Sequence, residues 1–191
     1  KAFQFVLIVS VPMMVYFILY AKESILFLAG ESFLPATASM IILMPTVLFI
    51  GLSNITGIQI LTPLRRENHV VCSVTAGAIL DFLLNLILIP KFGAAGAAFS
   101  TTMAEMLVLI IQCMYLRKQL WEMVKRIQVW KIVFAILFAS IAGVIFQNKI
   151  SMSVLGTLCV SAVLFLGVYG VVLLVLKEDF VSDIVKSIIK N

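Results

Sequence analysis

Charged residues are scarce in this sequence: Asp, Glu, Lys and Arg make up 12% of its 191 residues, about half the fraction found in soluble domains. Hydrophobic residues make up 63%, and the mean hydropathy is +1.18. This balance excludes a soluble globular domain and places the chain among membrane proteins. An apolar run follows Lys1 directly, with no basic leader and no cleavage site before it. We therefore expect the sequence to be a fragment whose N-terminal part is missing.

Residues that carry enzyme or metal chemistry are also few. The only histidine, His69, has no Asp four or five positions after it, and the chain has no phosphate-binding glycine loop. The three cysteines, Cys72, Cys113 and Cys159, lie far apart within apolar runs, where they suit a role as small apolar fillers. We expect no enzyme activity, no metal site and no cofactor.

Long apolar runs dominate what is present. Six of them are long enough to cross a membrane, which takes about 20 residues, and none alternates with a period of two, which excludes a barrel. The sequence predicts an all-α polytopic membrane bundle, with a six-helix lobe at 1–176 and a cytoplasmic tail at 177–191. The predicted spans are 2–21, 36–61, 70–89, 93–116, 129–146 and 152–176.

Two segments are expected to lie at the membrane surface. Segment 22–35 is too short to cross and predicts an interfacial helix or a re-entrant turn. The tail places apolar residues at helical spacing and predicts an amphipathic surface helix.

Positive charge is distributed unequally between the two sides that six spans define. One side carries eleven basic residues and the other three, Lys22, Lys91 and Lys149. By the positive-inside rule the richer side is cytoplasmic, so the C-terminus is predicted to be cytoplasmic. The basic cluster at 117–131 has two interleaved tryptophans; in a short loop it indicates contact with membrane lipids rather than with nucleic acid.

A reporter fused after Arg126 or at Asn191 is therefore expected to be cytoplasmic, and one fused at Lys149 is expected to lie outside. Alkaline phosphatase and green fluorescent protein fusions measure this directly. The reverse pattern at either location would contradict the charge argument.

Polar side chains form a stripe on each of two consecutive predicted spans. Asp81 lies four residues before Asn85 on the third span, and Thr101 lies four residues before Glu105 on the fourth. Residues four apart share a helix face, and carboxylates at this depth usually face a protein interior or a water-filled cavity. We interpret Asp81, Asn85 and Glu105 as candidates for a transport path or for ion coupling. The alternative is that they only hydrogen-bond between packed helices.

The second span is polar in its cytoplasmic half, where Asn54 and Gln59 are further candidates for the path. Pro45 interrupts this span at its middle, and Pro12 interrupts the first. Proline removes a backbone bond and leaves a carbonyl free within the membrane. Breaks of this kind occur in mobile transporter helices and in static ones.

Arg65 and Arg66 follow the polar half of the second span at its cytoplasmic end. They can be ordinary positive-inside residues. The functional alternative is that a guanidinium binds a phosphate-bearing headgroup, for which its planar fork is suited.

The stretch from Asn85 to Ala98, NLILIPKFGAAGAA, resembles a segment of the bacterial polysaccharide transporters, with Glu105 at a familiar distance. LAGESF before the second span and GIQIL within it are similar to further segments of that family. These are the lipid-linked oligosaccharide repeat-unit flippases of the multidrug/oligosaccharidyl-lipid/polysaccharide exporter superfamily. The resemblance covers nearly the whole chain and implies most of the C-terminal lobe of a two-lobed transporter. At Asp81 the chain departs from the family, where Asn or a small residue is expected.

The resemblance implies a flippase in the bacterial cytoplasmic membrane that moves undecaprenyl-diphosphate-linked oligosaccharides for capsule, O-antigen or exopolysaccharide assembly. Its expected partners are H+ or Na+ as coupling ion, membrane lipids, and the polymerase and glycosyltransferases of the same pathway. One alternative is a cation-coupled multidrug or peptidoglycan-precursor exporter of the same superfamily. A second is a membrane-embedded polymerase or acyltransferase, although the chain has neither a long outer loop nor a His with a nearby acid.

Overall fold

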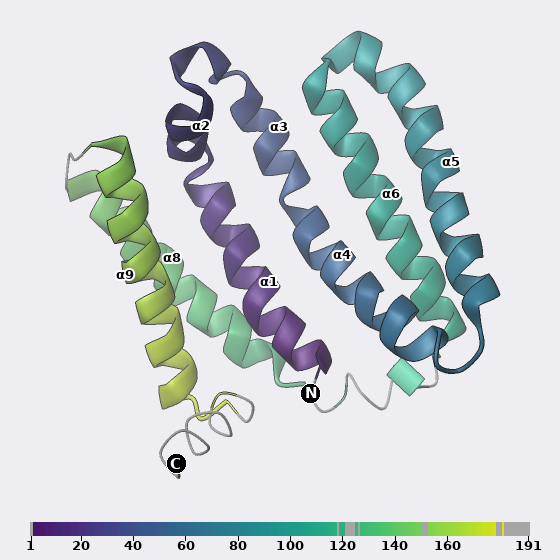
Figure 1. Ribbon diagram of the computed structural model, residues 1–191. Coiled ribbons are helices and arrows are strands. Elements are labelled where there is room, and N and C mark those ends of the chain that lie inside the picture. Colours follow the sequence, from purple (N-terminus) through teal and green to yellow (C-terminus); the bar gives the residue numbers. More distant parts are fainter. Residues whose placement is uncertain are drawn as a thin grey trace. The chain divides into compact units, whose positions relative to one another are not determined.

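The computed structural model describes residues 2–117, 119–120, 125, 127–149, 153–178 and 181, without the side chains of 148 and 149. Every regular element in these ranges is helical, and six helical stretches are long and apolar enough to cross a membrane (Figure 1). The predicted all-α polytopic bundle is thereby confirmed. The chain divides into two compact units: unit 1 is Lys1–Gly30 with Ile127–Asn191, and unit 2 is Glu31–Arg126.

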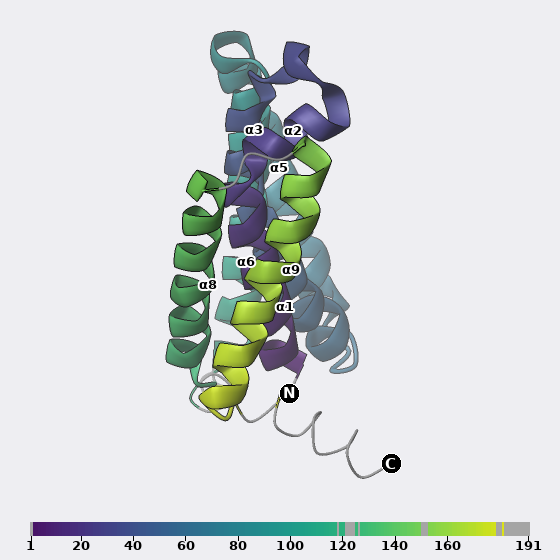
Figure 2. The same cartoon turned by 90° about the vertical axis from the view of Figure 1, so that its left-hand side faces the viewer.

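In the described ranges, unit 1 contains four long helical elements, which Figure 2 shows from the side. They are α1 (Ala2–Leu19), α2 (Ala21–Ala29), α8 (Val129–Lys149) and α9 (Val154–Val175). Helix α9 packs against α8, α1 and α2, and α1 packs against α8. Helix α2 begins at Ala21, the last residue of the first predicted span, and continues into segment 22–35, which was predicted to be too short to cross.

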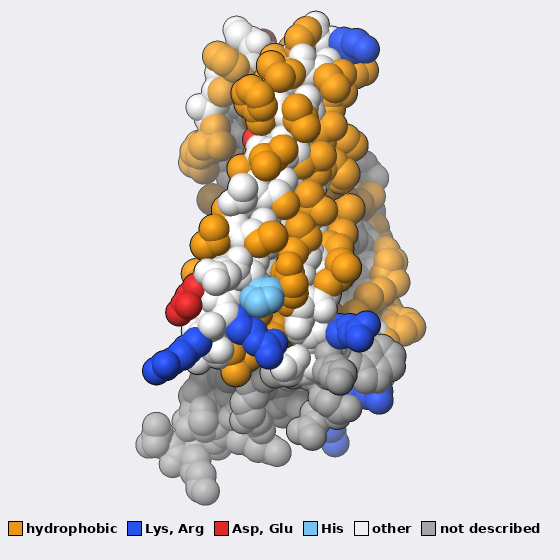
Figure 3. Space-filling model, turned by 90° about the vertical axis from the view of Figure 1, so that its right-hand side faces the viewer, with side chains coloured by type: hydrophobic (Ala, Val, Ile, Leu, Met, Phe, Trp, Pro, Cys, Tyr) orange, Lys and Arg blue, Asp and Glu red, His pale blue; other side chains and the backbone are white. Residues whose placement is uncertain are grey.

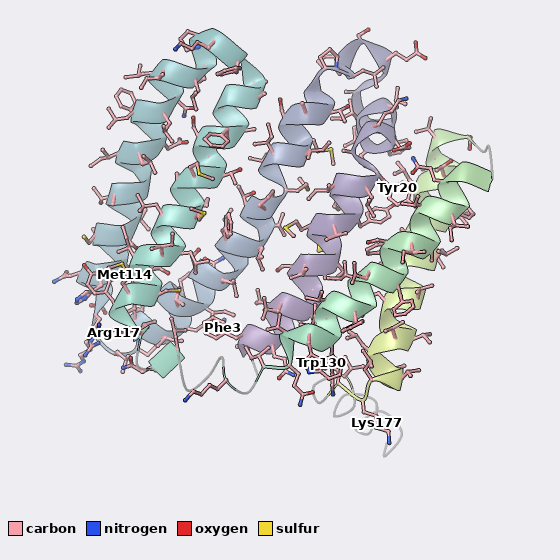
Figure 4. All side chains as sticks on the ribbon, turned by 180° about the vertical axis from the view of Figure 1, so that it is seen from behind. Phe3, Tyr20, Met114, Arg117, Trp130 and Lys177 are labelled. Atoms are coloured by element: carbon pink, nitrogen blue, oxygen red, sulfur yellow. The ribbon has the colours of Figure 1, made fainter. Side chains whose placement is uncertain are left out.

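The core of unit 1 contains aromatic rings together with the hydroxyl groups of its tyrosines. Tyr16, Tyr20, Phe165 and Tyr169 are buried there against the small residues Ala135 and Ala139 of α8. Buried tyrosine hydroxyls need partners, and each finds a backbone carbonyl on another helix. Tyr16 Oη donates to Leu158 O at 2.8 Å, and Tyr20 Oη donates to Gly143 O at 3.0 Å. In Figure 4 Tyr20 lies at the end of α1, beside α8.

Helix α1 continues through Pro12, although that residue was predicted to interrupt its span. Proline has no N–H, so the carbonyl four residues earlier, Ile8 O, loses its helical donor. The hydroxyl of Tyr169 on α9 donates to Ile8 O at 3.0 Å. A side chain from a neighbouring helix thus satisfies the carbonyl that the proline frees within the membrane.

The ends of three unit 1 helices meet in a polar cluster. The buried carboxylate of Glu178 accepts hydrogen bonds from Gln4 Nε2 and, at 2.8 Å, from Val181 N. Lys131 Nζ donates to Lys177 O at 2.8 Å. These bonds hold the starts of α1 and α8 to the end of α9. Most of the predicted amphipathic tail lies outside the described residues.

Unit 2 is built around α6 (Ala94–Tyr115), which packs against α3, α4 and α5. The second predicted span consists of three consecutive pieces: α3 (Ala36–Leu43), α4 (Pro45–Asn54) and the π-helical segment η2 (Ile55–Leu61). The third span is α5 (Glu67–Phe92), which extends three residues beyond each end of the predicted span 70–89. The predicted span follows the apolar run, whereas the helical backbone continues past that run to Glu67 and Phe92.

Helices α5 and α6 form a hairpin whose close packing depends on glycine. Gly93 joins them with φ +56°, a conformation that favours glycine. A Cβ on Gly96 would lie 2.4 Å from Leu88 O, and one on Gly77 would lie 2.5 Å from Val108 Cγ2. Both contacts are too short for a real Cβ, so only glycine allows the two helices this separation.

The surface of the molecule suits a membrane. On the face shown in Figure 3, hydrophobic side chains cover most of the length, and Lys and Arg side chains gather toward its lower end. Large side chains of α5 such as Phe82, Leu86 and Ile87 are more than half exposed. Exposed apolar surface of this extent is stable against lipid and not against water.

Candidate functional site

A cavity of about 410 Å³ lies among the helices of unit 2. Helix α6 lies between α4 with η2 on one side and α5 on the other, and all four elements contribute to the lining. Most of the lining is apolar, with six polar side chains set into it. These are Ser53, Asn54, Asp81, Thr101, Glu105 and Gln112.

Asp81 and Glu105 line this same cavity from consecutive spans. Both are half-buried, and Thr101 Oγ1 lies 3.4 Å from Asp81 Oδ1. Two carboxylates that share one cavity repel each other, so the site favours cations, protons or hydrogen-bond donors. The arrangement can hold a polar or cationic group within membrane-spanning helices.

Of the other three predicted path residues, one lines the cavity and two do not. Asn54, at the end of α4, lines the cavity, whereas Gln59 is exposed and does not. Asn85 lies one turn beyond Asp81 and also falls outside the lining, half-buried. Its Oδ1 is buried and has no hydrogen-bond partner in the described part of the chain.

Arg65 and Arg66 are exposed in the short connection between η2 and α5. Arg65 has φ +53°, and Arg66 N donates to Leu61 O at 3.0 Å, which makes this connection a compact turn. The cavity lining does not include either guanidinium. Both side chains are exposed at the end of the second span.

Gln112 is the cavity residue that sequence reasoning missed. Its side chain is 2% exposed and joins three spans. Gln112 Oε1 accepts from Thr56 Oγ1 of η2 at 2.5 Å, and Gln112 Nε2 donates to Ser73 Oγ of α5 at 3.1 Å. The signal was present in the sequence: Gln112 lies seven residues after Glu105, which is two turns along the same helix face.

The break at Pro45 is supported from α6. Helix α3 ends at Leu43, and Pro45 is the first residue of α4. Thr102 Oγ1 lies 2.8 Å from Ile42 O, a carbonyl in the turn before the proline, and 2.8 Å from Ala98 O of its own helix. A hydroxyl of a neighbouring helix thus reaches a carbonyl near Pro45, as it does near Pro12 in unit 1.

Other reactive groups do not join the cavity. His69 stacks edge-on against Tyr115 with ring centroids 4.1 Å apart. Cys72, Cys113 and Cys159 are free thiols. Within the described ranges, no group of three or more His, Cys, Asp or Glu side chains could hold a metal ion.

These features define a multi-pass α-helical membrane protein with a cavity into which six polar side chains are set. The uncharacterized membrane protein MJ1068 of Methanocaldococcus jannaschii is 28% identical to the chain over 196 residues, a match that covers 100% of this chain. The chain spans 38% of the length of that relative. No protein-family model matches the chain, and no solved structure matches it.

Proposed function

We propose that the chain is most of one lobe of a transporter that moves the headgroup of a lipid-linked oligosaccharide across a membrane. The observation that carries this proposal is the cavity in unit 2, where Asp81 and Glu105 are held between membrane-length helices. Carboxylates at such depth are costly and usually mark a substrate or ion pathway. In this proposal the protein forms no covalent bond with its substrate and acts by opening to each side in turn.

The chemistry of the lining suits a sugar headgroup. Carboxylate and amide oxygens accept hydrogen bonds from sugar hydroxyls, and the amides of Asn54 and Gln112 can also donate. Apolar residues such as Val74 and Ile58 form the rest of the wall, which suits the apolar faces of sugar rings. The lipid tail would remain in the bilayer while the headgroup passes through the cavity.

The turn at Arg65 and Arg66 supports recognition of the diphosphate that joins sugar to lipid. Both side chains are exposed at the end of the span whose α4 and η2 pieces form one cavity wall. Arginine binds phosphate through two parallel N–H groups. By the charge distribution this end is cytoplasmic, where lipid-linked oligosaccharides would enter.

A second candidate function is cation-coupled export of a drug or of a peptidoglycan precursor. The two carboxylates favour it, since they would attract a cationic drug as well as a coupling H+ or Na+. The substrate separates the two candidates. A glycan transporter is needed for the amount of polysaccharide on the cell surface, whereas a drug exporter raises the drug concentration that cells tolerate.

Asp81→Asn is expected to reduce export by the full-length protein about tenfold, the effect of about 1.4 kcal/mol on a rate-limiting barrier. The amide keeps the shape and the bond with Thr101 but removes the charge from the cavity. Surface glycan at equal membrane abundance measures the effect, and drug resistance is measured in parallel.

Glu67→Gln is the matched control, because it makes the same acid-to-amide change on α5 outside the cavity. It should leave export unchanged. If Asp81→Asn also exports both classes of substrate normally, the charge at Asp81 has no role in transport. A selective loss of drug resistance would favour the second candidate.

A further inference from the structure

The second span contains an unusual segment beside the cavity, the π-helical η2 (Ile55–Leu61). Helices with i→i+5 bonds are rare in proteins and often occur at functional sites. An i→i+5 bond closes the end of this segment, because Thr62 N donates to Gly57 O at 3.0 Å, and Thr62 Oγ1 donates to the same oxygen at 3.0 Å. In the turn that follows, Arg66 N donates to Leu61 O at 3.0 Å.

A buried amide holds the start of this segment. Thr56, which is fully buried, donates to Gln112 Oε1 at 2.5 Å, and Gln112 in turn donates to Ser73 on α5. Gly57 makes room for this contact, because a Cβ there would lie 3.1 Å from Gln112 Nε2. One side chain of α6 therefore ties the π-helical segment to both α5 and α6.

The segment also forms part of the cavity wall. Asn54, Gly57 and Ile58 line the cavity, and the span continues from there to the turn with Arg65 and Arg66. A π-helical turn contains one residue more than an α-helical turn. If η2 became α-helical, everything after it would turn by about 100°, the rotation of one α-helical residue.

We propose that η2 is a switch between π-helical and α-helical forms and that Gln112 is the positioning residue that holds the π-helical form. Breaking the Thr56–Gln112 bond releases the segment, which rewinds by one residue and turns the end of the second span. The rotation changes the cavity wall and reorients the arginine turn together. This inference concerns the conformation of the span and does not depend on which substrate is transported.

The rewinding predicts a specific exchange of positions. Leu61 is now fully buried, and Thr62 after it is exposed. When the register advances by one residue, Ile60 takes the buried position of Leu61, and Leu61 takes the exposed position of Thr62. The exposure of Ile60 must therefore decrease while the exposure of Leu61 increases.

Spin labels at Ile60→Cys and Leu61→Cys, each in full-length protein without its native cysteines, test this exchange in liposomes. Thr56→Val removes the hydroxyl and keeps the shape of the side chain. We expect Thr56→Val to raise the ratio of mobile to immobile label at position 61 about tenfold. A change of this size corresponds to the loss of one buried hydrogen bond. The label at 60 should become immobile. Thr56→Ser keeps the hydroxyl and should give the spectra of the unmodified protein.

Gln112→Met, which breaks the same bond from the other side, should reproduce the result of Thr56→Val. The label at 60 alone is decisive if a label at 61 prevents folding. Spectra of Thr56→Val and Gln112→Met that match those of Thr56→Ser would overturn the proposal. Loss of folded protein in both variants would also overturn it, since Gln112 would then be a structural tie in a single conformation.

Discussion

Replacing Gly96 with alanine is expected to destabilise the α5–α6 hairpin by about 3 kcal/mol, the upper part of the usual range for overpacking. The new Cβ would lie 2.4 Å from Leu88 O and 2.6 Å from Leu88 C. These are backbone atoms, so no rotamer change relieves the contact and the helices must separate. The gain in helix propensity from glycine to alanine, about 1 kcal/mol, is smaller. Because Asp81 and Glu105 lie on these two helices, the cavity would widen as well.

Thermal unfolding of the purified protein in detergent measures this loss, and membrane abundance gives a second reading. Gly167→Ala is the matched control, because nothing lies within 4 Å of a Cβ at that position. Gly77→Ala should also destabilise the hairpin, but Val108→Ala should relieve most of this loss, since the shortest contact there is with the Val108 side chain and the backbone contact with Ala104 O is longer, at 3.2 Å. An unchanged melting temperature in Gly96→Ala would show that the hairpin is less tightly packed than the structure indicates.

The sequence predicted the helical content, and it placed two carboxylates on consecutive membrane-length helices. Apolar run length alone located the six spans, because a bilayer leaves few alternatives to a helix of that length. Helical spacing placed Asp81 and Thr101 on stripes, and the structure brings these residues together. Such periodic features are visible in a sequence because they repeat locally.

Contacts between distant segments were beyond sequence reasoning. Helical spacing could have placed Gln112 on the face of Glu105, but it could not have predicted its bonds to Thr56 and Ser73, which lie 56 and 39 residues away. The π-helical form of η2 could not be predicted, because it is defined by the carbonyl to which each backbone N–H donates. The amino-acid composition of the segment does not determine that pairing. The sequence predicted a single lobe at 1–176. It did not predict that the first and last helices form one compact unit and the middle helices another.

The largest effect expected in unit 1 is the loss of the Tyr169 hydroxyl. Tyr169→Phe leaves the partly buried Ile8 O, one turn before Pro12, without the donor that now lies 3.0 Å away. An unsatisfied buried acceptor costs about 1–3 kcal/mol, so we expect a loss of about 2 kcal/mol in the free energy of unfolding. Thermal or denaturant unfolding in detergent measures it.

Pro12→Ala distinguishes this explanation from a general loss of packing. Alanine restores an N–H at position 12, which can bond to Ile8 O within α1, so Tyr169→Phe should cost about 1 kcal/mol less in that background. Tyr20→Phe is the control, because its hydroxyl bonds to Gly143 O, a carbonyl that no proline frees; its cost should be the same with and without the Pro12→Ala substitution. Equal costs of Tyr169→Phe in both backgrounds would mean that the hydroxyl does not compensate for the proline. A coupling that is confined to Tyr169 would show that α1 retains Pro12 inside the membrane only because α9 supplies the missing donor.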